Sequence, residues 1–139
     1  PGAREPGREA YLDELAALAA SLGVADAWLA SPPRADIADA YAEAALVLQL
    51  SNKPEAFGRT ALEALSIGRP VLGWAHGGVG ETLATLYPAG AVAPGDADAL
   101  LATARELLAA PPPPPVTIPW TLAAMQSATL DLYASLVDD

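Results

Sequence analysis

The middle of the chain, residues 46–82, alternates strand signals with helix signals: LVLQLSNKPEAFGRTALEALSIGRPVLGWAHGGVGET. Residues 46–50 form a short apolar run that ends in Ser-Asn-Lys-Pro, which is typical of a buried strand that leads into a loop. Residues 56–67 place apolar side chains at helical spacing and are followed by a C-cap glycine, Gly68. Pro70 stops the helix, and residues 71–74 are a second apolar run. A strand, a helix and a strand of these lengths predict a parallel βαβ unit with a right-handed crossover.

Two loops follow the two predicted strands, over residues 51–59 and 76–81. In parallel sheets of this kind ligands bind outside the carboxyl ends of the strands, so both loops should lie on the ligand edge. The second loop contains His-Gly-Gly-Val-Gly, which predicts a tight turn because glycine tolerates such backbone conformations. The polar residues of this region should therefore gather at one rim of the sheet.

Periodicity and breaker residues indicate the remaining elements. We expect Trp28 to point inward from its strand, Tyr41 to pack in the core and Asp96 to cap a helix. The five-proline run within residues 111–119 predicts an extended spacer rather than a ligand for proline-binding modules. The other predicted elements are helices over 9–22, 35–43, 82–86, 97–109 and 120–137, and strands over 24–30 and 90–93. The last helix offers several side chains for burial: Leu122, Met125, Leu130, Leu132, Tyr133 and Leu136.

Length and composition limit the classes of protein to consider. With 139 residues, 53% of them hydrophobic and 17% charged, the chain should fold as one globular domain with a sizeable core. Seven basic residues against seventeen acidic ones give a formal charge of −10, which opposes nucleic-acid binding. One histidine and no cysteine argue against a metal site and exclude disulfides. With no signal peptide and no apolar run as long as a membrane span, we predict a cytoplasmic location.

Two glutamates, Glu55 and Glu63, stand seven residues apart in PEAFGRTALEALSIGRPV, which is followed by GGVGE. This pattern resembles the Glu-x7-Glu motif of retaining GT-B glycosyltransferases, glycosyltransferase family 4 (group 1) in particular. Several features coincide with the acidic pair: Phe57-Gly58 after the first glutamate, Gly-x-Pro-Val before the second strand, and Gly-Gly-x-x-Glu after it. The resemblance extends more weakly over nearly the whole chain, as the C-terminal, donor-binding domain of that family.

The resemblance implies an α/β fold, a Rossmann-like three-layer αβα arrangement with a mainly parallel sheet. It implies a single nucleotide-sugar-binding domain over residues 1–139, without the first strand and the phosphate-holding turn that open such domains. We therefore expect a piece of a two-domain enzyme, a hexosyltransferase inactive by itself, whose missing N-terminal domain carries the acceptor site and any peripheral membrane contact. The substrate would be a nucleotide diphosphate sugar, with no separate cofactor.

The resemblance also assigns roles to residues. Glu55 would be catalytic and face the donor sugar hydroxyls, while Glu63 would bind the ribose diol. The segment Glu55, Ala56, Phe57, Gly58, Arg59 and Thr60 would hold sugar and diphosphate. Lys53 and His76 would lie at the rim, and Ser31 would lie in the loop that contacts the base. In that loop this chain has Ser-Pro-Pro where the family commonly has a glycine. This departure from the family pattern argues against the base contacts.

Elementary geometry is compatible with these roles. Eight helical residues rise roughly 12 Å, about the span from a transferred sugar across a diphosphate to a ribose. A carboxylate can accept two hydroxyl hydrogen bonds, and a helix N-terminus near Phe57 would favour phosphate. The alternative is that Glu55 and Glu63 are solvated helix glutamates, and that Lys53 and Arg59 are surface cations that balance them. Two further classes stay open: a non-catalytic flavodoxin-like αβ binding module, and a nucleotide-sugar epimerase of the same architecture.

Overall fold

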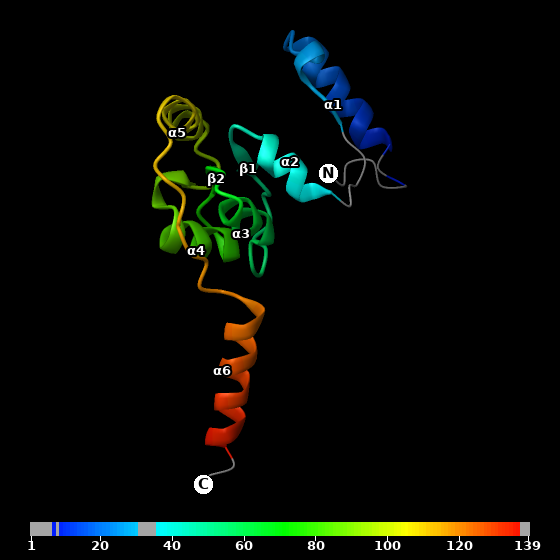
Figure 1. Ribbon diagram of the computed structural model, residues 1–139. Helices are drawn as coiled ribbons and strands as arrows, with labels where there is room; N and C mark the ends of the chain where they lie inside the picture. The colour runs from blue at the N-terminus through cyan, green and yellow to red at the C-terminus, as the bar shows by residue number, and fades with distance from the viewer. Residues whose placement is uncertain (1–6, 8, 31–35, 137–139) are drawn as a thin grey trace. The chain divides into compact units, whose positions relative to one another are not determined.

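The computed structural model describes Gly7, residues 9–30 and residues 36–136, and the chain forms two compact units, Pro1–Ile37 and Ala38–Asp139 (Figure 1). The first unit contains helix α1 (Glu9–Ser21) and a short 3-10 helix η1 (Ala25–Ala27). The predicted strand over 24–30 is wrong. Its backbone closes locally instead, with the Ala27 N–H donating to Val24 O at 3.0 Å and the Trp28 N–H to Ala25 O at 3.3 Å. Trp28 remains 37% exposed, so its predicted inward orientation is also wrong.

The second unit is built on three parallel strands, β1 (Val47–Gln49), β2 (Val71–Trp74) and β3 (Ala91–Val92), in the order β1-β2-β3. Val47 pairs with Val71, and Gly73 pairs with Ala91. The connections are helical: α3 (Arg59–Ser66) joins β1 to β2, and α4 (Gly77–Leu86) with the 3-10 helix η2 (Pro88–Gly90) joins β2 to β3. This is the predicted Rossmann-like α/β arrangement with a parallel βαβ unit.

Helices α3, α4 and α5 (Ala97–Ala109) contact the sheet, and α2 (Ile37–Glu43) precedes β1 (Figure 1). All four residues of β2 are buried, because the strand lies between two neighbours and beneath helices. The largest fully buried side chains are Leu65 of α3, Leu72 of β2 and Leu83 of α4. Each contributes about 1.5–3 kcal/mol of transfer free energy, and Tyr41 packs against this cluster as predicted.

Two helix starts differ from the prediction, and glycines lie at both of them. Helix α3 begins at Arg59 rather than at residue 56, because its N-cap Gly58 has φ +75°, which is outside helical geometry. Helix α4 begins at Gly77 rather than at residue 82, so the predicted glycine turn is the first turn of a helix. The glycines there serve close packing against the neighbouring loop, which a local reading of the sequence does not reveal.

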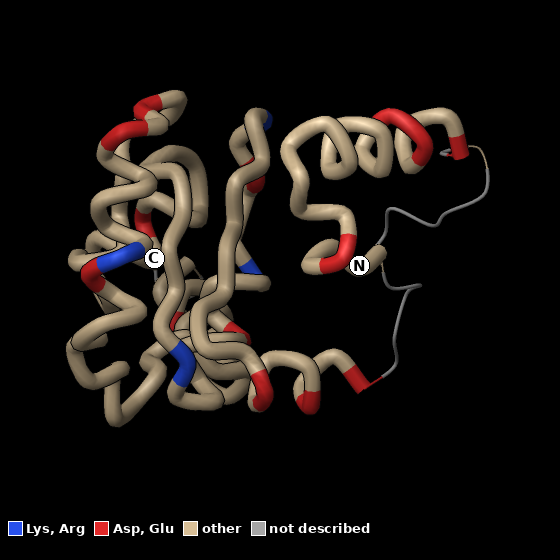
Figure 2. Tube along the Cα trace, turned by 90° about the horizontal axis from the view of Figure 1, so that it is seen from above, with Lys and Arg blue, Asp and Glu red and all other residues tan. Residues whose placement is uncertain are grey.

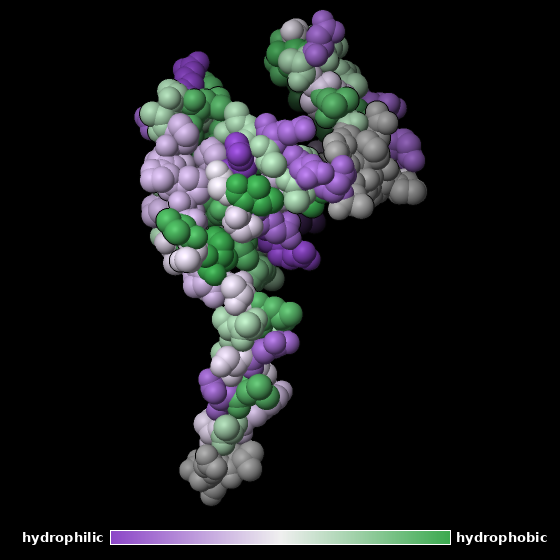
Figure 3. Space-filling view, viewed as in Figure 1, coloured by the Kyte–Doolittle hydropathy of each residue, from purple (hydrophilic) through white to green (hydrophobic). Residues whose placement is uncertain are grey.

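The C-terminal segment forms the predicted helix, α6 (Leu122–Ser135), but not the predicted burial. All six side chains expected in the core are at least 58% exposed, and Figure 3 shows hydrophobic residues at the surface along α6. Residues 111–115 are neither helix nor strand, and they separate α6 from the helices that contact the sheet. None of the described helices combines the length and the apolar character that a membrane span requires.

Tyr87 joins the proline segment to the core. Its ring is 2% exposed, and its hydroxyl donates a hydrogen bond to Pro112 O at 3.1 Å. Burial raises the pKa of Tyr87 above the ordinary value of 10.0. The folded chain therefore holds the phenol proton more tightly than the unfolded chain. The stability from this group is fully present below pH 10 and is lost as pH rises from there through the raised pKa.

Replacing Tyr87 by phenylalanine should lower the free energy of unfolding by about 1 kcal/mol at pH 7, because one hydrogen bond is lost. Above pH 10 the variant should lose stability less steeply than the wild type. Urea denaturation at pH 7 and in steps above pH 10 measures both effects. Tyr133→Phe on the exposed face of α6 is the matched control and should behave as the wild type. An equally steep decline in Tyr87→Phe would contradict the assignment.

Candidate functional site

The carboxyl ends of β1 and β2 meet at one rim, where the loop over residues 50–58 and the segment over residues 75–76 leave the sheet. A narrow pocket at this rim is lined by Gln49, Ser51, Lys53, Glu55, Trp74, His76 and Val79. The sequence therefore correctly predicted that the two loops share one edge. Among the described residues no group of three or more His, Cys, Asp or Glu could hold a metal ion.

Glu55 is held from two sides. Gln49 Nε2 donates a hydrogen bond to Glu55 Oε1 at 2.6 Å. The backbone N–H of Gly78, in the first turn of α4, donates to Glu55 O at 2.8 Å. The side chain of Glu55 is half-buried, and its backbone lies outside α3. Eight residues of helical rise therefore do not set the separation of Glu55 from Glu63, and this part of the prediction is wrong because Gly58 ends the loop in a left-handed conformation.

Gly58 brings the N-termini of α3 and α4 together. A Cβ atom at this position would lie 2.8 Å from Val79 N and 2.9 Å from Gly78 O, so any side chain would force the two helices apart. No side chain caps the first turn of α3. The N–H groups of Arg59 and Thr60 consequently have no acceptor within the helix, which is the arrangement that binds anions. The predicted phosphate-binding segment thus ends in a helix N-terminus.

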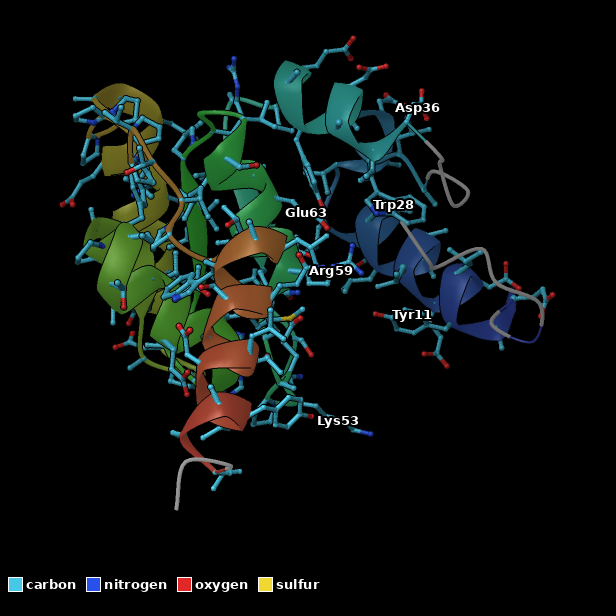
Figure 4. All side chains as sticks on the ribbon, turned by 60° about the horizontal axis from the view of Figure 1, so that its bottom comes forward. Tyr11, Trp28, Asp36, Lys53, Arg59 and Glu63 are labelled. Atoms are coloured by element: carbon cyan, nitrogen blue, oxygen red, sulfur yellow. The ribbon has the colours of Figure 1, made fainter. Side chains whose placement is uncertain are left out.

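Glu63 pairs with Arg59 one turn earlier on α3. The Arg59 Nη2 and Nε atoms lie 2.9 Å and 3.2 Å from Glu63 Oε1, and Figure 4 shows the two side chains reaching toward each other. The Arg59 side chain is 80% exposed and that of Glu63 is 38% exposed. Such an exposed pair is worth at most about 1 kcal/mol, so either partner can exchange it for a ligand at little cost.

The cations near the rim stand out against an acidic chain. Figure 2 shows far more Asp and Glu positions than Lys and Arg positions along the described trace. Lys53 is exposed and extends away from the ribbon (Figure 4). Arg59 follows six residues later at the start of α3. Together they offer local positive charge where an anionic ligand would otherwise be repelled.

His76 links the two rim loops. Its Nε2 lies 3.0 Å from Ser51 O, and because a carbonyl only accepts, Nε2 must carry the proton in this contact. His76 is also the N-cap residue of α4. It therefore lies at the rim as predicted and supports the loop structure. Ser31, the other predicted rim residue, lies outside the described residues.

The aromatic residue of the predicted site faces an apolar groove. Phe57 is 52% exposed, and Ala56 beside it is also exposed. The groove of about 1070 Å³ lies between the start of α3 and the start of α6, and is lined by Phe57, Arg59, Trp120, Thr121, Leu122, Ala124, Met125 and Ala128. Sequence reasoning assigned Phe57 to the donor site but did not bring Trp120 beside it.

Gln49 is the site residue that sequence reasoning missed. A usable signal was present, because Gln49 is the one polar residue in the apolar run over residues 46–50. A polar side chain in a predicted buried strand requires a hydrogen-bond partner, and at the last strand position that partner belongs to the rim. The loop that follows β1 supplies it, through Glu55.

Residues 6–116 match the family model described as glycosyl transferases group 1, which includes the whole rim and all three strands. The chain matches no curated protein and no solved structure.

Proposed function

Since the chain belongs to glycosyl transferases group 1, we propose that it is the donor-binding domain of a retaining GT-B enzyme of glycosyltransferase family 4. The full enzyme would transfer a sugar from a nucleotide diphosphate sugar to an acceptor carried by a further domain. One observation carries the proposal: the two glutamates flank the uncapped N-terminus of α3 in the chain, with Glu55 before it and Glu63 one turn after it. Family membership favours sugar transfer over a non-catalytic binding module.

Each part of the donor has a partner of suitable chemistry. Glu55 keeps its Oε2 atom free of Gln49 and accepts hydrogen bonds from the sugar hydroxyls. The first-turn N–H groups of α3, at Arg59 and Thr60, and the positive end of the helix receive the diphosphate. Glu63 receives the ribose diol, which requires that it give up Arg59.

The exchange at Glu63 follows from its exposure. The guanidinium of Arg59 pairs with phosphate oxygens at least as well as with a carboxylate, because its planar donors match both. When a diphosphate arrives at the start of α3, Arg59 turns toward it and frees the Glu63 carboxylate. Lys53 adds a second positive charge, and His76 holds the start of its loop at Ser51 O.

Catalysis then rests on orientation and charge. The sugar is held by Glu55, while the helix N-terminus and the two cations stabilise the negative charge that develops on the departing diphosphate. Glu55 is fixed before the reaction, because it is already held by β1 and α4. The donor itself is the substrate, and the scheme uses no cofactor.

Calorimetric titration of the full-length protein with UDP, GDP and ADP, without and with magnesium, tests the proposal. One nucleotide should bind selectively. Glu63→Ala should weaken that binding roughly 10- to 100-fold, because a charged acceptor of two hydroxyl groups is lost. Folding should be almost unaffected, since the Arg59 pair is exposed.

Glu106→Ala on α5 is the matched control, because it removes one exposed carboxylate from a helix that does not border the rim pocket. Its nucleotide affinity should equal that of the wild type. If neither variant changes binding, the ribose role of Glu63 is wrong. If the full-length wild type binds none of the three nucleotides, the transferase proposal is overturned.

A further inference from the structure

Gln49, the last residue of β1, uses both ends of its side-chain amide. Its Oε1 accepts a hydrogen bond from the Ser51 backbone N–H at 3.1 Å, and its Nε2 donates to Glu55 Oε1 at 2.6 Å. The Ser51 N–H can only donate, so the amide oxygen must face it and the amide nitrogen must face Glu55. The orientation of the amide is therefore set by the backbone and not by the carboxylate.

The backbone around Glu55 is fixed independently of Gln49. The Gly78 N–H holds Glu55 O at 2.8 Å, and His76 Nε2 holds Ser51 O at 3.0 Å. What these bonds leave free is rotation of the Glu55 side chain. Within the described part of the chain, the bond from Gln49 is the one hydrogen bond that the Glu55 carboxylate receives. Gln49 thus selects the direction in which the carboxylate points.

The surroundings strengthen this contact. Trp74, at the end of β2, is 8% exposed and lines the same pocket as Gln49 and Glu55, so one wall of the contact is apolar. The bond from the Gln49 amide goes to a charged acceptor, and hydrogen bonds of that class are roughly twice as strong as neutral ones. Oε2 of Glu55 is left for a ligand.

We propose that Gln49 is a positioning residue that sets the affinity for the sugar part of the donor through the Glu55 carboxylate. The inference rests on the proposed function, in which Glu55 faces the sugar and the nucleotide is bound elsewhere. Loss of the Gln49 amide should weaken the binding of the sugar nucleotide and leave the binding of the free nucleoside diphosphate unchanged.

Two substitutions separate the two hydrogen bonds of Gln49. Gln49→Met keeps the length of the side chain but removes both bonds. Gln49→Glu keeps an acceptor for the Ser51 N–H, and it replaces the donor to Glu55 with a like charge. Both variants should point the Glu55 carboxylate away from its wild-type direction, whereas only Gln49→Met also loosens the base of the loop.

The measurement is the dissociation constant of the full-length protein for UDP, GDP and ADP and for UDP-glucose, GDP-mannose and ADP-glucose. In Gln49→Met and in Gln49→Glu the sugar nucleotide that the wild type binds should bind roughly tenfold more weakly. The matching nucleoside diphosphate should bind as in the wild type. In a Glu55→Ala background, Gln49→Glu, which keeps the acceptor for the Ser51 N–H, should cause no further loss, since Gln49 acts through Glu55.

The remaining outcomes separate failure of this inference from failure of the proposed function. Equal weakening of sugar nucleotide and nucleoside diphosphate would mean that Gln49 merely supports the loop. An unchanged sugar nucleotide affinity, or a full tenfold loss in the Glu55→Ala background, would also overturn the positioning role while the donor site stands. A wild type that binds no nucleotide and no sugar nucleotide would overturn both.

Discussion

Gly78→Ala should lower the free energy of unfolding by about 3 kcal/mol, because a buried methyl group meets backbone rather than a movable side chain. The added Cβ would lie 2.5 Å from Phe57 Cα and 2.6 Å from Phe57 N. Gly78 lies in the first turn of α4, where alanine would otherwise be favoured over glycine by about 1 kcal/mol. The contact with the loop outweighs this gain, so the substitution should lower the free energy of unfolding.

The same substitution should disrupt the site. The Gly78 N–H holds Glu55 O, so any movement of α4 that relieves the contact also moves Glu55. Urea denaturation measures the stability, and nucleotide titration of the folded fraction measures the site. Gly95→Ala is the control: its backbone has φ +82° but its added Cβ meets nothing within 4 Å, so it should cost only about 1–2 kcal/mol. Equal stability of the two variants would refute the packing argument.

Local signals predicted those elements whose structure is decided locally. Helix α5 runs over Ala97–Ala109 as predicted, because Asp96 Oδ1 accepts the Ala99 N–H at 2.9 Å and so caps the helix from within the segment. Strands β1 and β2 lie inside the two apolar runs, and the proline and glycine between them end α3 where expected. Each of these features depends on residues close together in the sequence.

The failed predictions depend on partners far away in the chain. Residues 24–30 are apolar enough for a strand, but a strand requires a neighbour, and none pairs with them among the described residues. The glycines at 77–80 look like a turn in isolation, but they form the first turn of α4, in which Gly78 packs against the backbone of Phe57. The apolar side chains of α6 are compatible with burial, but the sequence does not say what they pack against.

The candidate site likewise has features that local sequence predicts and features that only the folded structure reveals. The spacing of Glu55 and Glu63 identified both residues, since a motif is a local pattern. The left-handed Gly58 that takes Glu55 off the helix, and the bond from Gln49 that orients it, are properties of the folded rim. The sequence therefore nominated the candidate residues, and the structure is needed to say how they are held.

Glu55→Gln should lower the rate of sugar transfer about 100-fold, with little change in stability. The substitution keeps the size of the side chain, and its Oε1 can still accept from Gln49 Nε2, so the carboxamide stays in place. What it loses is the negative charge that orders the sugar hydroxyls against the departing diphosphate. The effect should appear in kcat more than in the affinity for the nucleoside diphosphate, because the proposed function assigns nucleotide binding to α3.

Release of nucleoside diphosphate from the sugar nucleotide by the full-length protein measures this rate, and it can be followed with water as the acceptor. Glu106→Gln removes the same charge from α5 and should react at the wild-type rate. The comparison separates a role in the reaction from a general change in charge on this acidic chain. A Glu55→Gln variant with the wild-type rate would show that the carboxylate has no part in transfer. Glu55 would then be a residue that closes the loop between β1 and α3, held by Gln49 for stability alone.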